Sequence, residues 1–273
     1  MDTAAAIRHL RADPASADLI RDAYLDADVQ AAADRFGDSA EWAATRELLA
    51  TTLVPGCVAL DLGAGNGIAS AALARVGARV VALDPDPGND VGLGALRVVT
   101  GSLPVAAVVG VGESIPLPDG VVDLVYGRQV LHHAADLPQM LGECARVLRP
   151  GGIFFACREH VVDDEAQLAE FLAWHPVHQL AGGEHAFSLS EYLAAIEGAG
   201  LKIDRLVGPL DSVINAFPHA RSDEEVRTAP RDRLRARFGT VGGWLGALAP
   251  GLVRARMNQQ GAGRLYAFLA RKP

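Results

Sequence analysis

Residues 59–68, ALDLGAGNGI, constrain the fold of this chain more than any other stretch. An apolar run containing one acid is followed by glycine at every second position, Gly63, Gly65 and Gly67, and then by a helix-like segment. A strand that turns through glycines into a helix lets a ligand approach the backbone, because no Cβ intervenes, and it offers free N–H groups at the helix start. The stretch therefore predicts a strand, turn and helix that bind a nucleotide-like ligand.

Short β-like runs alternate with helix-like stretches from Cys57 onward. This alternation is typical of an α/β fold in which a parallel sheet carries helices on both faces. The expected strands cover residues 57–62, 78–84, 104–110, 121–127, 152–157, 201–208 and 263–271. The expected helices cover residues 66–76, 91–101, 135–152 and 188–200, the last with Ser190 as its N-cap. We therefore expect one main domain built around such a sheet.

Two segments do not follow the alternation. Residues 1–55 read as a helical cap, and residues 209–262 form a long insertion rich in Gly, Pro and Arg. Insertions of this length are often lids or binding elements, so the core is expected to comprise 56–208 and 263–273. The arginines of the insertion make either a solvated helical face or a lid for an anionic substrate. They are Arg221, Arg227, Arg231, Arg233, Arg235, Arg237, Arg254 and Arg256.

Composition and charge exclude several classes of protein. The formal net charge of −8 argues against a general nucleic-acid or anionic-membrane footprint. No run of about 18 apolar residues lacks a charge, and charged residues break the N-terminal stretch, so neither a membrane span nor a secretory signal is expected. Cys57, Cys144 and Cys157 are odd in number and lie in apolar contexts, which indicates buried thiols in a reducing, cytoplasmic setting.

The spacing of the glycines separates two kinds of nucleotide site. A dinucleotide fingerprint, G-x-G-x-x-G, would require glycine at position 68, where the chain has Ile68. Asp84 ends the next expected strand, 17 residues beyond Gly67, and a carboxylate there can accept both hydroxyls of a ribose. The pattern favours a nucleoside site, although the glycines could instead only form a tight turn while Asp84 caps the following segment.

Four motifs in order give the chain a family resemblance. LDLGAGNG, VVALDPD, GESIPLPDGVVDLVYGRQVLHH and ARVLRPGGIFFACREH resemble the class I S-adenosylmethionine-dependent methyltransferases, especially ubiquinone and menaquinone methyltransferases and small-molecule tailoring enzymes. The resemblance covers about residues 55–160 and continues more weakly to about 207. It implies a Rossmann-like, seven-stranded, mostly parallel sheet whose last strand, 263–271, is antiparallel. It also implies S-adenosylmethionine as cofactor and a small molecule as substrate.

The same resemblance assigns roles along the cofactor. It places Asp61, Gly63, Ala64 and Gly65 at the methionine part, Asp84 on the ribose, Pro85 near the adenine, and Arg128 and His133 at the methionine end. The family normally has Gly-Asp-Ala after the third strand, whereas this chain has Gly110-Val111-Gly112-Glu113. The acid that usually binds the adenine amino group is therefore missing from its place. Either Glu113, next to Gly112, substitutes for it or the backbone alone holds the adenine.

The candidate catalytic residues are those expected at the carboxyl ends of the strands, where such sheets bind ligands. Methyl transfer is a displacement that needs alignment, exclusion of water and, for some nucleophiles, a base. His133, Glu159 and His160 are the first candidates, and His185 is an alternative base; His132 is equally consistent with local packing. The histidine-rich segment 175–185 could bind a metal with His160, but it has no tight ligand motif, so we expect a substrate wall and no metal.

These observations favour O-methylation of a secondary metabolite or sugar hydroxyl, with C-methylation as the nearest rival. A nicotinamide oxidoreductase is disfavoured by Ile68 and by the lack of a Tyr-x-x-x-Lys pair. A module that only binds the nucleoside remains a third alternative. We expect a monomer or homodimer with no nucleic-acid or membrane partner.

Overall fold

The core of the protein is a twisted sheet whose strand order is β3-β2-β1-β4-β5-β8-β7. The computed structural model describes residues 1–248 and 250–273, apart from the side chains of 233, 237, 238 and 241–250. Strands β1 to β5 pair in parallel, and β8 runs antiparallel to both β5 and β7. The strands are β1 Val58–Leu62, β2 Arg79–Asp84, β3 Val105–Val109, β4 Val122–Arg128, β5 Leu148–Val162, β7 Lys202–Val207 and β8 Arg264–Arg271. The predicted Rossmann-like sheet with its antiparallel last strand is confirmed.

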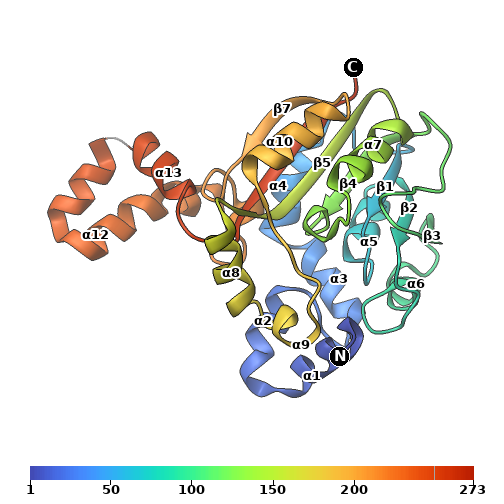
Figure 1. The fold of residues 1–273 in the computed structure, drawn as a ribbon, viewed down its shortest axis with the longest axis horizontal. Helices are drawn as coiled ribbons and strands as arrows, with labels where there is room; N and C mark the ends of the chain where they lie inside the picture. Colours follow the sequence, from blue (N-terminus) through green and yellow to red (C-terminus); the bar gives the residue numbers. More distant parts are fainter. Residues whose placement is uncertain (249) are drawn as a thin grey trace.

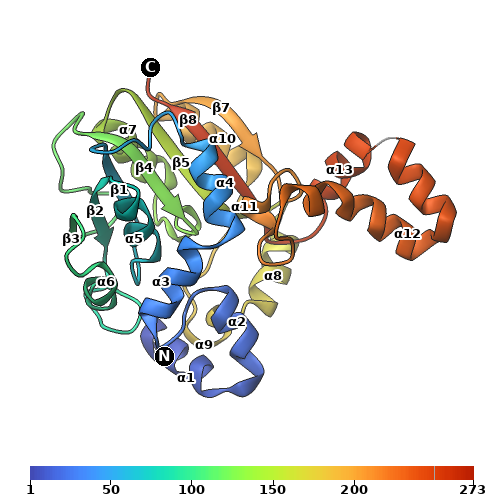
Figure 2. The same cartoon turned by 180° about the vertical axis from the view of Figure 1, so that it is seen from behind.

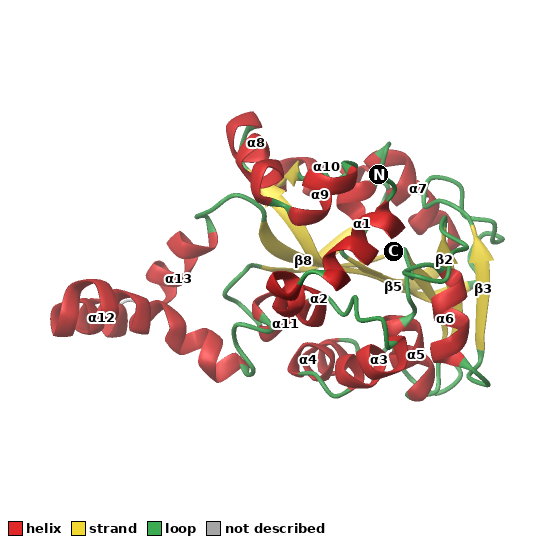
Figure 3. Cartoon of the chain, turned by 90° about the horizontal axis from the view of Figure 1, so that it is seen from below, coloured by secondary structure: helices red, strands yellow, loops and turns green. Residues whose placement is uncertain are grey.

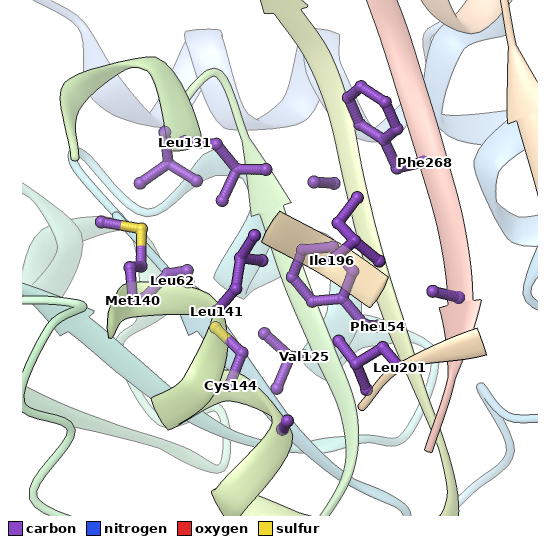
Figure 4. Packing of buried hydrophobic residues seen from close by; sticks show 14 of the residues in the cluster. Leu62, Val125, Leu131, Met140, Leu141, Cys144, Phe154, Ile196, Leu201 and Phe268 are labelled. Atoms are coloured by element: carbon purple, nitrogen blue, oxygen red, sulfur yellow. The ribbon is translucent and has the colours of Figure 1, made fainter. Parts of the chain in front are cut away.

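Helices cover both faces of the sheet, as the view from below shows (Figure 3). One face carries α7 Leu137–Val147 and α10 Leu189–Gly198, and the other carries α3 Val29–Gly37, α4 Ala40–Leu48, α5 Ile68–Arg75 and α6 Leu93–Thr100. Under α7 and α10, the side chains of Leu62, Val125, Leu141, Phe154 and Ile196 interlock (Figure 4). Burial of apolar surface on both faces therefore holds the sheet between its helices.

The glycine turn between β1 and α5 is constrained by packing as well as by a ligand. Gly63, Gly65 and Gly67 all have positive φ, at 67°, 50° and 85°. A Cβ on Gly63 would lie 2.4 Å from the side chain of Val130, and one on Gly67 would lie 2.7 Å from that of Leu96. The turn therefore needs glycine at both positions whether or not a ligand is bound.

The N-terminal segment and the segment after β5 meet at the carboxyl ends of the parallel strands (Figure 1). The first comprises α1 Thr3–Ala12, η1 Pro14–Ser16 and α2 Ala17–Asp22, and the second comprises α8 Glu165–Trp174 and α9 Pro176–Ala181. The guanidinium of Arg11 donates to the carbonyl oxygens of Leu25, Asp26 and Asp90. Arg11 therefore ties α1 to two loops that border the strand ends.

Two boundaries differ from the sequence prediction. The prediction extended the helix of α7 to residue 152, but Leu148 already pairs with Val122, so β5 begins there and continues to Val162 by pairing with β8 and with the short β6, Phe187–Ser188. The N-cap of α10 is Ser188 rather than Ser190, because Ser188 forms a capping box with Glu191.

The insertion predicted at 209–262 is mostly helical. It contains α11 Val213–Ala216, α12 Asp223–Leu248 and α13 Pro250–Asn258. Figures 1 and 2 show α12 and α13 projecting away from the body of the molecule. Among the described residues, no helix is both long enough and apolar enough to cross a membrane.

Candidate active site

Two adjoining cavities open at the carboxyl ends of the parallel strands. The first, of about 500 Å³, is bordered by Asp84, Pro85 and the 110–113 loop, and the second, of about 530 Å³, by Asp61, Arg128 and His160. Both cavities share a wall, which we call the common wall. It consists of Leu25, Gly63, Gly65, Val91, Gln129, His133, Val177 and Glu184. A ligand in the first cavity can therefore meet a ligand in the second across the common wall.

Asp84 lies beside the glycine turn, as the sequence predicted. Its Oδ2 accepts the Gly65 N–H at 2.8 Å and its Oδ1 accepts the Asp86 N–H at 2.9 Å. Each carboxylate oxygen keeps acceptor capacity toward the first cavity. Burial raises the pKa of Asp84, and the backbone hydrogen bonds partly offset this effect. The carboxylate is suited to receive two neighbouring hydroxyls of a ribose.

Asp61 lines the second cavity at the end formed by the glycine turn, which we call its glycine end. It is buried, and its Oδ2 accepts the hydroxyl of Ser70 at 2.5 Å. Burial, with a smaller contribution from Asp84, raises the pKa of Asp61 to about 7. A positively charged ligand group would favour its carboxylate form, because opposite charges lower a carboxyl pKa. Ala64 borders the same cavity, as expected for residues at the methionine part.

The 110–113 loop borders the end of the first cavity that was assigned to the adenine. Pro85, Gly112 and Glu113 all line it. The carboxylate of Glu113, however, already accepts the N–H groups of Ala135 and Asp136 at 2.8 and 3.4 Å. Both hydrogen bonds end on Oε1, so recognition of the adenine by Oε2 of Glu113 and recognition by the backbone both stay predictions.

Arg128 lines the second cavity, but its guanidinium forms an ion pair with Glu41 in the N-terminal cap. Its Nε and Nη2 donate to Glu41 at 2.7 and 3.2 Å, and Nη1 of Arg158 lies 3.7 Å from the same carboxylate. All three side chains are nearly inaccessible to solvent. No sequence motif pointed to Glu41, which connects α4 to the ends of β4 and β5.

Glu159, predicted as a catalytic group, lines neither cavity. It is fully buried and accepts the N–H groups of Val130 and His132 at 2.9 and 3.2 Å. Its Oε2 also lies 2.8 Å from Nδ1 of His132. Although burial alone would raise the pKa of Glu159, these partners hold it below its usual range. This geometry favours a role in positioning His132, and a direct catalytic role for Glu159 stays a prediction.

His132, which lines the second cavity, lies close to His133 and Glu184 of the common wall. Nε2 of His132 lies 3.6 Å and Nε2 of His133 lies 3.8 Å from Oε2 of Glu184. Burial opposes the charge on His132, but Glu159 and Glu184 outweigh it and raise its pKa. Burial and the charge of His132 lower the pKa of His133. The sequence favoured His133, left His132 undecided and offered no signal that Glu184 would meet both.

The remaining two histidine candidates differ in position. His160 lines the second cavity, and its Nδ1 donates to the Gly263 carbonyl at 2.9 Å. Burial and the charge of His132 lower the pKa of His160 to about 3, so its ring is neutral with Nε2 as acceptor. His185 lies outside both cavities, with its ring edge-on to Phe187 at 4.6 Å. The structure places His185 away from these cavities, and its role as an alternative base stays a prediction.

The insertion contributes little to these cavities. Of its described side chains, Pro218 and His219 line the second cavity and none of its arginines lines either one. The side chains of Arg233 and Arg237 lie outside the described residues. A lid role for 209–262 and the predicted domain boundaries stay predictions.

The parallel sheet, the glycine turn and the acid at the end of β2 together define a Rossmann-like protein with a nucleoside site. Residues 60–156 match a family described as a methyltransferase domain. The ubiquinone biosynthesis O-methyltransferase of Methylobacterium sp. is 32% identical over 167 residues, which cover 60% of this chain and 67% of that protein. The enzyme of the same name from Rhizobium etli is 31% identical over 128 residues. That match covers 47% of this chain and 51% of the relative, so the chain spans about half the length of such relatives.

Solved structures share the fold. An S-adenosylmethionine dependent methyltransferase from Mesorhizobium loti has a TM-score of 0.57 at 18% identity, covering 86% of this chain and 99% of that one. Geranyl diphosphate C-methyltransferase from Streptomyces coelicolor A3(2) has a TM-score of 0.56 at 17% identity, covering 85% and 76%. The chain belongs to the class I S-adenosylmethionine-dependent methyltransferases.

The residues present fit the cofactor of this class. Asp84 offers two carboxylate oxygens to a ribose, and Asp61 offers a carboxyl group whose charged form a cationic amino-acid end would stabilise. The glycine turn brings backbone close to both cavities. S-adenosylmethionine is thus the cofactor that the first cavity and the glycine end of the second are suited to hold.

Proposed function

We propose that this chain methylates a hydroxyl oxygen of a small molecule, a secondary metabolite or a sugar derivative. The observation that carries the proposal is the position of His132, His133 and Glu184 where the two cavities meet. The relatives that are about 31–32% identical are named O-methyltransferases, which supports oxygen as the methyl acceptor.

Each group at the site has a role in such a reaction. S-adenosylmethionine supplies a methyl group on a positively charged sulfur: the carbon–sulfur bond breaks as the carbon–oxygen bond forms, S-adenosylhomocysteine leaves, and the hydroxyl proton passes to a neutral histidine of the site or to solvent. A neutral hydroxyl is a weak nucleophile, so groups that stabilise its ionised form accelerate the step. His132, His133 and Glu184 lie at the junction of the two cavities, beside the position that we assign to that oxygen. Glu159 fixes the ring of His132. The helices α1 and α9 cover the strand ends and restrict water.

The substrate is expected to bind in the second cavity. Apolar side chains from the cap and from the segment after β5, among them Leu19, Trp174 and Val177, line it beside the histidines. An anionic substrate held by the insertion has less support, because none of the described arginines of 209–262 lines the cavity. A monomer or homodimer without a nucleic-acid partner stays our expectation, and three buried, free cysteines fit the cytoplasmic setting predicted.

Carbon methylation is the second candidate, and a binding module without catalysis is the third. The test uses the full chain with S-adenosylmethionine and a panel of phenols, catechols and sugar nucleotides. S-adenosylhomocysteine formation is measured by mass spectrometry, and the methylated atom is assigned by carbon NMR. We expect a methyl ether as product. A carbon–methyl product would establish the second candidate, and S-adenosylhomocysteine binding by calorimetry without any transfer would favour the third.

A further inference from the structure

His132, His133 and Glu184 form a cluster whose nitrogen and oxygen atoms are too far apart for direct hydrogen bonds but close enough to bind one ligand between them. The two Nε2 to Oε2 separations of 3.6 and 3.8 Å exceed the length of an N–H···O hydrogen bond. In a tetrahedral zinc site with bonds of about 2.1 Å, neighbouring ligand atoms lie about 3.4 Å apart. One donor atom from each of His132, His133 and Glu184 lies within 4.8 Å of the others. The three atoms are thus close enough to one another to bind a single ion.

A second, independent feature is the group behind His132. Nδ1 of His132 lies 2.8 Å from Oε2 of Glu159 and donates to that carboxylate, so Nε2 is the ring nitrogen directed toward Glu184. A cation would take the place of the proton that Nε2 carries when the ring is charged. Metal-binding histidines almost always donate their other ring N–H to a carboxylate or carbonyl in this way. Glu159 is in turn fixed by the N–H groups of Val130 and His132. Such a supported ring is oriented before any ligand arrives.

The balance of charge points the same way. Glu159 and Glu184 are both secluded, and in the part of the chain that the structure describes neither pairs with a lysine or an arginine. A protonated His132 ring compensates one of the two carboxylates and leaves the other without a counter-charge among the described residues. One divalent cation between neutral rings would balance both charges. His175, whose Nδ1 lies 4.0 Å from Oε1 of Glu184, adds a further nitrogen at the edge of the cluster.

We propose that His132, His133 and Glu184 bind one first-row divalent cation, of the zinc or manganese type, with an open position toward the second cavity. Imidazole with one carboxylate suits these ions better than magnesium or calcium, which prefer oxygen ligands. This inference departs from the expectation, drawn from the sequence, that the site binds no metal. His133 and Glu184 line both cavities, so a ligand at the open position would sit between them.

The cation would also define the substrate more narrowly. A hydroxyl oxygen bound to it would lose its proton to solvent at a lower pH, because the ion stabilises the oxyanion. A substrate with two neighbouring oxygens could occupy two positions on the ion. This catalytic part rests on the proposed function, whereas binding of the ion does not.

The test measures binding first. The full chain, stripped with EDTA and dialysed, is titrated by calorimetry with ZnCl2, MnCl2 and MgCl2, and Co2+ is added to record its visible absorption. We expect one zinc or manganese ion per chain, weaker binding of magnesium, and cobalt bands that indicate nitrogen and oxygen ligands. Glu184→Gln and His133→Ala should each weaken zinc binding by about 100-fold, since the first removes the charge of one ligand and the second removes a nitrogen ligand. His185→Ala, beside Glu184 in sequence but outside both cavities, should bind as the wild type does.

Circular dichroism and thermal melts check that each variant folds. If Glu184→Gln does not fold, His133→Ala still tests the proposal, because 45% of the His133 side chain is exposed and its truncation should be tolerated. Absence of binding at one ion per chain, or binding that survives both substitutions, would overturn the proposal. S-adenosylhomocysteine binding and methyl transfer are measured on the same stripped protein. Transfer by the stripped protein would leave the methyltransferase proposal intact and reject the catalytic role of the cation, while its binding is judged by the titrations alone. A bound ion without transfer to any compound would support the cation site and count against the methyltransferase proposal.

Discussion

Nδ1 of His132 lies 2.8 Å from Oε2 of Glu159, and both side chains are buried at the end of β4. This pairing fixes which nitrogen of His132 faces the second cavity. Glu159→Gln keeps the volume but supplies one carbonyl oxygen for three N–H groups. We expect kcat to fall by about 100-fold with little change in the affinity for S-adenosylhomocysteine, because Glu159 lines neither cavity. Single-turnover kinetics and calorimetry measure the two quantities.

The same substitution should lower stability by about 1–3 kcal/mol, since at least one buried N–H loses its acceptor. Urea denaturation measures this loss. Glu165→Gln, in the first turn of α8, is the control for a carboxylate near the site in sequence. Equal loss of cofactor affinity and kcat in Glu159→Gln would contradict the positioning role.

Asp84 is expected to govern binding of the cofactor. Asp84→Asn keeps one oxygen to accept the Gly65 N–H but loses the charge and one acceptor. The affinity for S-adenosylhomocysteine should fall by about tenfold or more, because one charge-assisted hydrogen bond contributes about 1.5–3 kcal/mol. Calorimetry measures the change. Asp204→Asn, which removes a charge paired with Arg271 away from both cavities, should have no effect. Unchanged affinity in Asp84→Asn would refute the ribose assignment.

Asp61 makes both cofactor binding and stability depend on pH. Its pKa of about 7 in the free protein means that about half of the molecules carry its charge at neutral pH. If the cofactor binds the carboxylate form, its affinity should drop by about tenfold between pH 8 and pH 6. The affinity of Asp61→Asn should be weak and nearly independent of pH over this range. Calorimetry at three pH values tests this expectation.

The ionisation of Asp61 affects the stability of the cofactor-free protein in the opposite direction to cofactor affinity: stability falls as the pH rises. The folded pKa of Asp61 is raised above its unfolded value, so its favourable contribution is complete below about pH 4 and is lost as the pH rises through about 7. Without cofactor, Asp61→Asn should therefore raise the melting temperature at pH 8 more than at pH 5. Each kcal/mol corresponds to about 2–4 °C in a protein of this size. A larger gain at pH 5 would contradict the shifted pKa.

Arg11 is expected to keep the cap closed over the common wall. Its guanidinium donates to the carbonyl oxygens of Leu25 and Asp90. Leu25 belongs to the common wall, and Asp90 directly precedes the wall residue Val91. Arg11→Ala should weaken S-adenosylhomocysteine binding by about tenfold, mainly through faster dissociation. Stopped-flow displacement measures the dissociation rate. Arg21→Ala, which removes an exposed arginine paired only with Asp18 and Asp22, should leave it unchanged.

Glu41 is expected to be essential for folding of the cap onto the sheet. Glu41→Gln leaves the buried guanidinium groups of Arg128 and Arg158 without a counter-charge. Removing one partner from a buried ion pair typically costs about 3–5 kcal/mol. Chemical denaturation should show a loss of this size, while Glu47→Gln on the exposed side of the same helix should change stability by less than about 0.5 kcal/mol. A small loss in Glu41→Gln would show that solvent reaches the arginines.

The sequence by itself determined the α/β class and the cofactor end of the site. The glycine turn and Asp84 are local consequences of chain chemistry: positive φ strongly favours glycine, and neighbouring parallel strands bring their carboxyl ends together. The adenine end was predicted less well, since only the fold shows that the carboxylate of Glu113 is bound to the start of α7.

Tertiary structure alone decided the catalytic end. In a regular strand, Glu159 would point to the face opposite Arg158 and His160, but an irregular register between Ala156 and Glu159, with φ of 61° at Arg158, changes where these side chains point. The meeting of Glu184 with His132 and His133 joins segments about 50 residues apart, and that of Glu41 with Arg128 spans 87 positions. Periodicity reports the face of one element and not which elements meet, because packing of the whole sheet and its cap fixes those contacts.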